Sequence, residues 1–315
     1  MLRRQFLNHA LVAGGLASLG QLSWVQASAQ ALRVARMKGD ATYYMSAAGI
    51  EPAGPVEYFE FPGGNLVTEA MTSNQLDLGP MSEIPPIFSA ERNAPFKLIA
   101  VWKSDLSGQA VLTPPGSPVI DFDHLKGRRI GYVRSTTSHY FLLKALNERG
   151  LSFADITPVP LTPQDGFAAF KAGQLDAWFI YGIFIQLAKF QANAKVLKTG
   201  HGYLSGNIAY AASNEAIANP EKHQSIRAFL LDQQKVWDWQ DRNPTQWAQV
   251  SEEITGVPAA LYLDQYNNRS HASRWGTVDE EAIRSQQQVA DLFYETKVLK
   301  KPIDASLLWD KSFTL

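Results

Sequence analysis

The chain has 315 residues, of which 45% are hydrophobic and 19% charged, and its formal net charge is −1. This length exceeds the roughly 100–200 residues of one domain, so two lobes are expected. The composition excludes a disordered chain, and the near-neutral charge argues against a nucleic-acid partner. The chain contains no cysteine, which excludes disulfides, thiol nucleophiles and cysteine-ligated metal sites.

The first 29 residues are typical of an export signal. Arg3 and Arg4 precede an apolar stretch, residues 10–22, that is shorter than the roughly 20 residues of a membrane-spanning helix. Small residues at positions 27–31 are spaced as in a cleavage site. We therefore expect a cleaved signal peptide at residues 1–29, of the twin-arginine type, with an ordinary secretory signal as the alternative. Without a cysteine to lipidate, the mature protein is expected to be free in the periplasm.

Strands and helices alternate as far as Asn214, and helices alone follow it. This alternation favours an α/β fold with largely parallel sheets. The predicted strands are residues 32–37, 56–61, 76–78, 97–102, 109–113, 129–133, 177–180 and 208–212. The predicted helices include residues 65–73, 224–239, 245–255 and 280–294.

Two segments repeat one pattern. Residues 70–77 and 169–176 each predict a helix end, a left-handed residue (Asn74 or Gly173) and a short strand. We interpret the repeat as a duplicated lobe, with chance similarity as the alternative. The proline-rich segment 113–118 predicts a lobe boundary. The expected division is lobe one at residues 32–113 plus 211–315, and lobe two at residues 114–210.

Candidate binding residues lie in loops that follow predicted strands, where open α/β sheets bind ligands. The amides of Gly64 and Asn65 precede a helix and could face an anion, although a plain tight turn is the alternative. Ser82 and Glu83 form a second loop before a helix.

A third loop carries consecutive hydroxyl groups and a fourth carries aromatic rings. The hydroxyls exceed what one helix cap needs, so they predict a donor cluster for a tetrahedral oxyanion; they belong to Ser135, Thr136, Thr137 and Ser138. His139 is expected to be structural. Trp178 and Tyr181 could form a wall of the pocket. Signatures of nucleotide-binding, zinc-protease and serine-hydrolase enzymes are absent, and no metal or cofactor is expected.

Five segments resemble the periplasmic aliphatic-sulfonate-binding proteins of ABC importers, within the wider taurine-, nitrate- and thiamine-precursor-binding group. They are FEFPGGN (59–65), EIPPIF (83–88), STTSHYFLLKAL (135–146), LTPQDGFAAFKAGQLDAW (161–178) and ADLFYE (290–295). The resemblance spans residues 33–309. It implies a type II periplasmic-binding-protein fold, with two lobes that each contain a mostly parallel sheet flanked by helices. It also implies a monomer that closes on its ligand and delivers it to a membrane permease.

The same resemblance implies which residues lie near the ligand: Lys38, Gly64, Asn65, Ser82, Glu83, Thr136, Thr137, Ser138 and Trp178. Three positions depart from the family pattern. Met37 replaces a glutamine and Ser135 replaces a glycine. Tyr-Gly-Ile at residues 181–183 replaces the usual Trp-Asp-Pro, which removes an acidic side chain. A less polar or bulkier ligand tail is therefore expected.

The expected function is capture of an organosulfur anion as a sulfur source: an alkyl or aryl sulfonate, or a sulfate ester. We expect neutral donors of residues 64–65 and 136–138 to hold its head, with Trp178 against its tail; charge pairing to Arg134 or Lys38 is the competing view. Alternative functions are binding of nitrate-like, pyrimidine or vitamin-precursor ligands, or a non-cysteine enzyme on the same fold. The protein is not expected to be an enzyme.

Overall fold

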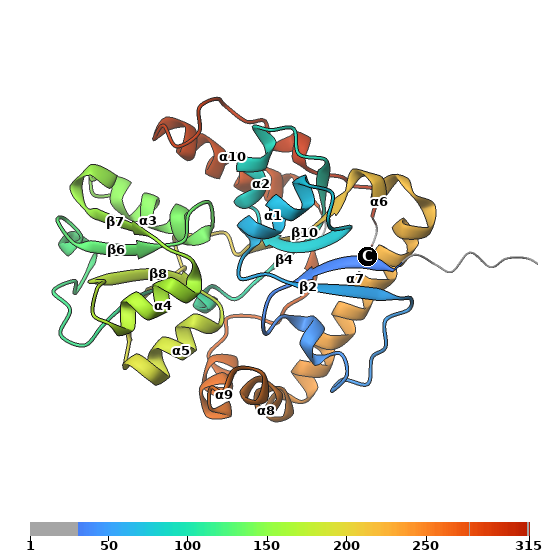
Figure 1. Cartoon of the computed structure of the whole chain (residues 1–315), viewed down its shortest axis with the longest axis horizontal. Helices are drawn as coiled ribbons and strands as arrows, with labels where there is room; N and C mark the ends of the chain where they lie inside the picture. Colours follow the sequence, from blue (N-terminus) through green and yellow to red (C-terminus); the bar gives the residue numbers. More distant parts are fainter. Residues whose placement is uncertain (1–30, 277, 314) are drawn as a thin grey trace, which may run out of the picture.

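The structure is a computed structural model that describes residues 31–276, 278–313 and 315. The predicted signal peptide, residues 1–29, lies outside the described residues. Two lobes lie side by side in Figure 1, one coloured green to yellow and the other blue, teal and orange to red. Within the described part of the chain, no helix is long and apolar enough to cross a membrane.

The first lobe contains a sheet with helices on both faces. Its strand order among the described residues is β11 (Trp275–Gly276), β4 (Phe96–Lys103), β10 (Asn207–Ser213), β3 (Leu78–Ser82), β1 (Leu32–Arg36) and β2 (Val56–Glu60). β1, β2, β3 and β4 run in one direction, and β10 and β11 run in the other. The helices of this lobe are α1 (Gly64–Thr72), α2 (Pro85–Ala90), α6 (Asn214–Ala218), α7 (Pro220–Arg242), α8 (Pro244–Thr255), α9 (Ala259–Asn267) and α10 (Glu280–Glu295).

The second lobe contains a smaller sheet. Its strand order is β7 (Thr157–Pro160), β6 (Arg129–Tyr132), β8 (Ala177–Tyr181), β5 (Gln109–Thr113) and β9 (Lys195–Thr199). Only β5 runs against the other described strands. The flanking helices are α3 (Thr137–Asn147), α4 (Pro163–Lys171) and α5 (Ile183–Ala192). The expected α/β fold of two lobes, each with a sheet flanked by helices, is thus confirmed. Both sheets are mixed: most strands of each run in one direction, but at least half of the neighbouring pairs are antiparallel. Short 3-10 helices lie at Ala41–Tyr44, Leu106–Gly108, Phe122–His124, Phe153–Asp155 and Ala305–Leu308.

The chain passes between the lobes twice, and both crossings differ from the expected boundaries at residues 113 and 211. β5 pairs with β8 and β9, so the first crossing lies between Lys103 and Gln109. β10 pairs with β3 and β4, so the second lies between Thr199 and Asn207. The proline-rich segment that suggested a boundary is a turn within lobe two. The two crossing segments are joined by a hydrogen bond from the Ser104 amide to the Gly206 carbonyl (2.8 Å).

The sequence repeat corresponds to equivalent structures in the two lobes. Arg33 of β1 forms an ion pair of 2.9 Å with Asp77, and Arg129 of β6 forms one of 2.8 Å with Asp176. Each arginine also donates to the carbonyl of a left-handed residue at a helix end, Asn74 in one lobe and Gly173 in the other. In both lobes the same local interaction therefore joins a strand, a helix end and the residue that begins the next strand segment, which supports the duplication.

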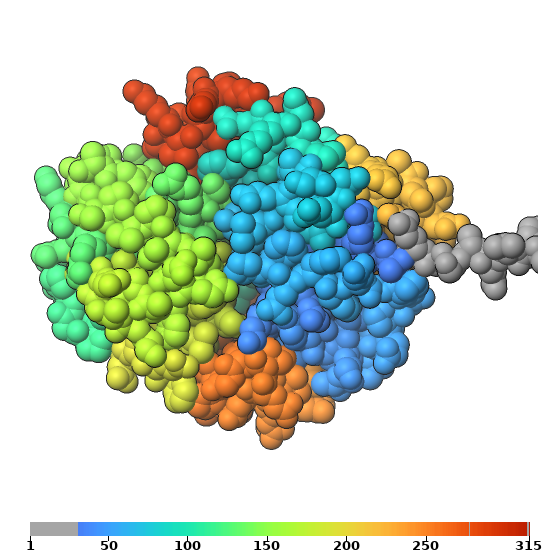
Figure 2. Space-filling model, in the orientation of Figure 1, coloured from blue at the N-terminus to red at the C-terminus, as the bar shows by residue number. Residues whose placement is uncertain are grey.

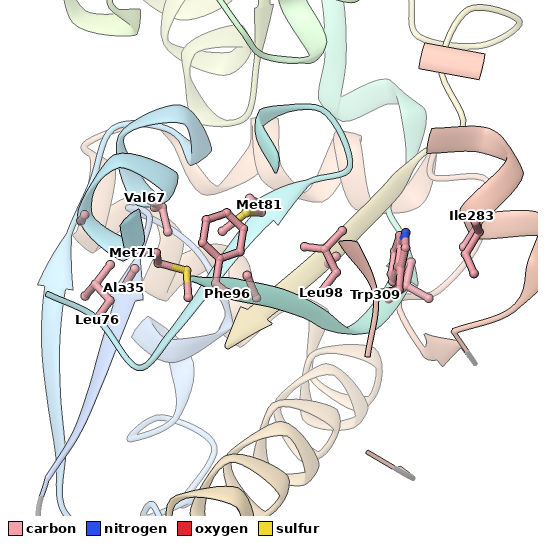
Figure 3. Close-up of a cluster of buried hydrophobic side chains, with 14 residues drawn as sticks. Ala35, Val67, Met71, Leu76, Met81, Phe96, Leu98, Ile283 and Trp309 are labelled. Atoms are coloured by element: carbon pink, nitrogen blue, oxygen red, sulfur yellow. The ribbon is translucent and has the colours of Figure 1, made fainter. Parts of the chain in front are cut away.

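Apolar side chains cover both faces of the first sheet. Figure 3 shows Val67 and Met71 of α1 on one side of Phe96, and Leu98 and Trp309 on its other side, within one cluster. On the opposite face, a second cluster includes residues of α7. These cores fix the ends of β1, β2 and β3, from which the loops facing the other lobe begin.

Candidate functional site

The N-terminus of α1 lies against β3 because Gly64 leaves room for the strand. A Cβ on Gly64 would stand 2.9 Å from the Cβ of Met81, so only glycine allows this approach. The amide of Leu66 already donates to the carbonyl of Gly63 (3.2 Å). The amides of Gly64 and Asn65 have no acceptor among the described residues. Unpaired amides in a first helical turn suit an anion.

The loop of consecutive hydroxyls, residues 135–138, lies at the N-terminus of α3, but the hydroxyl protons of Thr136, Thr137 and Ser138 are already donated within the protein. Thr136 Oγ1 donates to the Val133 carbonyl (2.8 Å). Ser138 Oγ donates to the Phe179 carbonyl (2.6 Å) and accepts from the Val133 amide (3.0 Å). Thr137 Oγ1 donates to a side chain of β5, that of Gln109 (2.7 Å). These hydroxyls therefore hold α3 on its own sheet, which differs from the expectation that they bind the ligand directly.

The backbone amides of the same turn remain available. Those of Thr137, Ser138 and His139 have no acceptor among the described residues. They therefore form a second set of donors at a helix N-terminus, where the helix dipole also favours negative charge.

The hydroxyl of Tyr181 lies between these two helix N-termini. A Cβ on Gly63 would stand 2.7 Å from it. The hydroxyl is buried and makes no hydrogen bond within the described structure. Burial raises the pKa of the Tyr181 phenol, and the nearby side chain of Thr136 offsets part of this rise although the two do not reach hydrogen-bonding geometry. The phenol is therefore a protonated donor without an acceptor.

Glu83 links lobe one to the second crossing. Its carboxylate accepts from Ser205 (2.6 Å), Asn207 (2.8 Å) and Ser285 (3.0 Å). Burial raises its pKa, and these hydrogen bonds offset part of the rise. The neighbouring Ser82 hydroxyl accepts from the amide of residue 84 (3.4 Å). Glu83 thus holds the crossing segment beside the end of β3.

Trp178 lies in the core of lobe two. Its side chain is 0% exposed, and Cβ atoms on Gly131 and Gly166 would each stand 2.9 Å from it. The two glycines leave the space that the indole fills, beside the ring of Phe170. This placement differs from the expectation that Trp178 packs against a ligand tail.

Cavities along the boundary between the lobes contain several predicted residues. One of about 420 Å³ includes Asn65 and Arg134. A larger one of about 520 Å³ includes Lys38 and Tyr181. The space beside Glu83 and Thr137 is nearly filled, at about 10 Å³. Lys38 and Arg134 are both exposed.

His139 is structural, as expected. Its ring lies 5.2 Å from that of Phe293 and 5.4 Å from that of Phe153, so it joins aromatic groups of both lobes. Its Nδ1 accepts from the Ser135 amide (3.2 Å). Burial, with the charge of Arg134 nearby, lowers the pKa of His139 from 6.5 to about 4, so the ring is neutral at neutral pH.

The sequence analysis did not single out several residues that line the larger cavity. Phe61 and Pro62 follow β2, and Ile183, Phe184 and Leu187 belong to α5. Apolar residues at helical spacing, like those of α5, are typical of core positions. Their exposure to the other lobe depends on tertiary structure, which the spacing does not reveal.

Comparisons with known proteins agree with this architecture. The model of the family described as NMT1/THI5 like matches residues 32–246. The chain is 30% identical over 301 residues to an Escherichia coli protein provisionally named for binding aliphatic sulfonates, covering 93% of each chain.

Two solved structures are also similar to this chain. The periplasmic aliphatic sulphonate binding protein of Escherichia coli is 28% identical, with a TM-score of 0.77 over 89% of this chain and 97% of that one. The alkanesulfonate-binding protein of Xanthomonas axonopodis pv. citri, bound to MOPS, is 26% identical, with a TM-score of 0.81 over the same shares.

Proposed function

We propose, from the premise that this chain belongs to the NMT1/THI5-like family, that it is the substrate-binding component of an ABC importer for organosulfur anions. Relatives and solved structures named for sulfonate binding cover nearly the whole chain, which supports a binding function over an enzymatic one. The structural observation that carries the proposal is the buried, unpaired hydroxyl of Tyr181 between two sets of free helix amides.

The sulfonate or sulfate head would lie between the first turns of α1 and α3. Its oxygens would accept hydrogen bonds from the amides of Gly64 and Asn65, from those of residues 137–139, and from the Tyr181 hydroxyl. These donors are neutral, which suits an anion that stays ionised and takes no proton from its host. Closure would be coupled to binding, because lobe one supplies one group of donors and lobe two supplies the rest.

Neutral donors are sufficient for useful affinity. A hydrogen bond to a charged group contributes about 1.5–3 kcal/mol net, and micromolar binding needs about 8 kcal/mol. Several convergent donors can therefore hold the head without a buried cation. Lys38 and Arg134, the competing anchors, are exposed, so water screens their charge.

The remaining roles follow from this proposal. The N-terminal signal would export the protein to the periplasm, where it would act as a monomer and deliver its ligand to a membrane permease. The absence of cysteine excludes desulfination by a cysteine nucleophile.

Calorimetry on the mature protein tests the proposal. The titrants are ethanesulfonate, benzenesulfonate and an alkyl sulfate, with nitrate, acetate and a pyrimidine as competitors. We expect organosulfur anions to bind with Kd in the micromolar range or below, and Lys38→Ala and Arg134→Ala to retain most of this affinity. Binding of nitrate or the pyrimidine alone would contradict the ligand class. Loss of most affinity in a charge variant would contradict the neutral-donor mechanism.

A further inference from the structure

The larger cavity between the lobes has an apolar wall that begins at Tyr181. Its volume is about 520 Å³. Apolar side chains from both lobes line it: Met37, Phe61 and Pro62 from lobe one, and Ile183, Phe184 and Leu187 from lobe two. Tyr181 lines this cavity and also carries the unpaired hydroxyl, so the cavity lies beside the proposed head site.

Figure 2 shows the yellow-green atoms of lobe two meeting the blue atoms of lobe one along a seam. The cavity is formed across the boundary between these lobes, since its lining residues come from both. A ligand that occupied it would therefore contact both lobes with its tail as well as with its head.

The charged groups that line this cavity carry opposite signs, so a cationic tail gains no net attraction there. Glu60 lines it, and its carboxylate accepts a hydrogen bond from the hydroxyl of Tyr43. The guanidinium of Arg36 lies 4.3 Å from the centre of the same tyrosine ring. The other charged lining residue is Lys38, which repels an ammonium group.

The backbone beside the cavity is fixed by a buried carboxylate whose two oxygens both accept hydrogen bonds. Asp40 accepts from the Met37 amide (2.9 Å) and from both the amide (2.9 Å) and the hydroxyl (2.5 Å) of Thr42. Burial raises its pKa to about 6, and the Thr42 and Met37 hydrogen bonds offset part of the rise. Asp40 therefore holds the loop of Met37 and Lys38 in place and offers no free carboxylate oxygen to a cationic ligand.

Resting on the proposed function, we infer that the preferred ligand is a sulfonate with a large apolar tail, aryl or long-chain alkyl, which lies in this cavity. A short zwitterionic sulfonate such as taurine leaves the apolar wall uncovered and places a charged ammonium group beside it, where the group loses part of its hydration. Burial of each additional methylene increases affinity about fourfold, until the cavity is filled.

The second cavity, of about 420 Å³, is the competing place for the tail. It shares Pro62 with the first cavity and includes Leu161 from the loop before α4. Its lining also includes Asn65, Arg134, Thr162 and Asp165, so a larger share of its wall is polar. Leu161 provides a matched control for residues of the apolar cavity, because it lines only the competing one.

Calorimetric titration with ethanesulfonate, butanesulfonate, hexanesulfonate, naphthalene-2-sulfonate and taurine tests the inference. Ethanesulfonate is also the control for folding and for an intact head site in each variant. In the parent protein, we expect hexanesulfonate to bind at least about tenfold more tightly than ethanesulfonate, and taurine to bind more weakly than ethanesulfonate.

Leu187→Trp should fill the cavity and weaken binding of hexanesulfonate and naphthalene-2-sulfonate about tenfold or more, while the affinity for ethanesulfonate stays within about twofold. Ile183→Ala should reduce the gain in affinity per added methylene of the alkanesulfonate. Leu161→Ala should leave this gain unchanged. Equal affinities across the alkyl series, or tightest binding of taurine, would overturn the tail assignment while leaving the proposed function intact. Sensitivity to Leu161→Ala alone would place the tail in the competing cavity and overturn the inference. Failure of every sulfonate to bind would overturn the proposed function as well.

Discussion

The Tyr181 hydroxyl and Gly63 face each other across the two lobes: a Cβ on Gly63 would stand 2.7 Å from the phenol oxygen. Gly63 precedes α1 in lobe one, and Tyr181 ends β8 in lobe two. The glycine therefore leaves space for a buried polar group that has no partner of its own. An unpaired hydroxyl between helix N-termini is costly unless a ligand uses it.

A double-mutant cycle tests this contact. Gly63→Ala should lower the free energy of unfolding by about 1–2 kcal/mol in the parent, because the new methyl group displaces the phenol. In the Tyr181→Phe background, the same change should cost much less, since the oxygen is gone. Urea unfolding measures both differences. Gly54→Ala, where no atom lies within 4 Å of the added Cβ, is the control. Additive effects of the two substitutions would refute the contact.

Glu83 is expected to stabilise the junction between the lobes. Glu83→Ala leaves Ser205, Asn207 and Ser285 without their shared acceptor, so the free energy of unfolding should fall by about 2–4 kcal/mol. Chemical denaturation of both proteins measures the change. Glu69→Ala on the exposed side of α1 should change it by less than about 0.5 kcal/mol. If Glu83→Ala changed the free energy of unfolding as little as Glu69→Ala, Glu83 would not stabilise the junction.

The lowered pKa of His139 predicts that the folded protein loses stability in acid. Its pKa is lowered to about 4 in the folded protein, against 6.5 for the free side chain, so the unfolded chain binds the proton more readily. The contribution of neutral His139 to the free energy of unfolding is therefore fully present above pH 6.5. It is lost as the pH decreases towards 4, by roughly 3 kcal/mol in total. Unfolding titrations of the parent and of His139→Phe over this range measure the contribution.

The His139→Phe variant should show a weaker pH dependence than the parent. His201→Gln, at an exposed histidine, should retain the parental dependence. Identical slopes for the parent and His139→Phe would show that His139 does not carry the effect.

Much of the fold could be predicted from local patterns. The strand at residues 129–133 and the helix at residues 280–294 agree with β6 and α10, because alternating or helically spaced apolar residues directly reflect one buried face. The strand predicted at residues 76–78 is instead β3, Leu78–Ser82. Gly79 and Pro80 obscured it, since both residues are unfavourable in strands.

Strands at sheet edges were harder to find. β7 contains two prolines, and β9 has two lysines and a threonine among its five residues; each strand lies at an edge of the second sheet. Such edge strands have weak apolar patterns because only part of their surface is buried. The crossings at residues 103–109 and 199–207 could not be predicted either, since a sequence pattern does not state with which sheet a strand pairs.

The candidate site was only partly predictable. Helix N-termini at Gly64 and Thr137 follow from glycine and hydroxyl residues after strands. The partners of Ser138 and Trp178 depend on segments far away in the chain, namely Phe179 for the hydroxyl and Gly131 for the indole. Their packing roles therefore became visible only in the folded structure.

The most direct test of the proposed head site is calorimetric titration of the parent and Tyr181→Phe with ethanesulfonate. Loss of a hydrogen bond to a charged group should weaken binding roughly tenfold or more. The free energy of unfolding should stay equal or rise, because the variant removes a buried hydroxyl that has no partner. Tyr44→Phe is the control. The Tyr44 hydroxyl is hydrogen-bonded to Ser251 (2.9 Å), so this variant should lose stability and keep the parental affinity for ethanesulfonate. Equal affinity of Tyr181→Phe and the parent for ethanesulfonate would contradict the account.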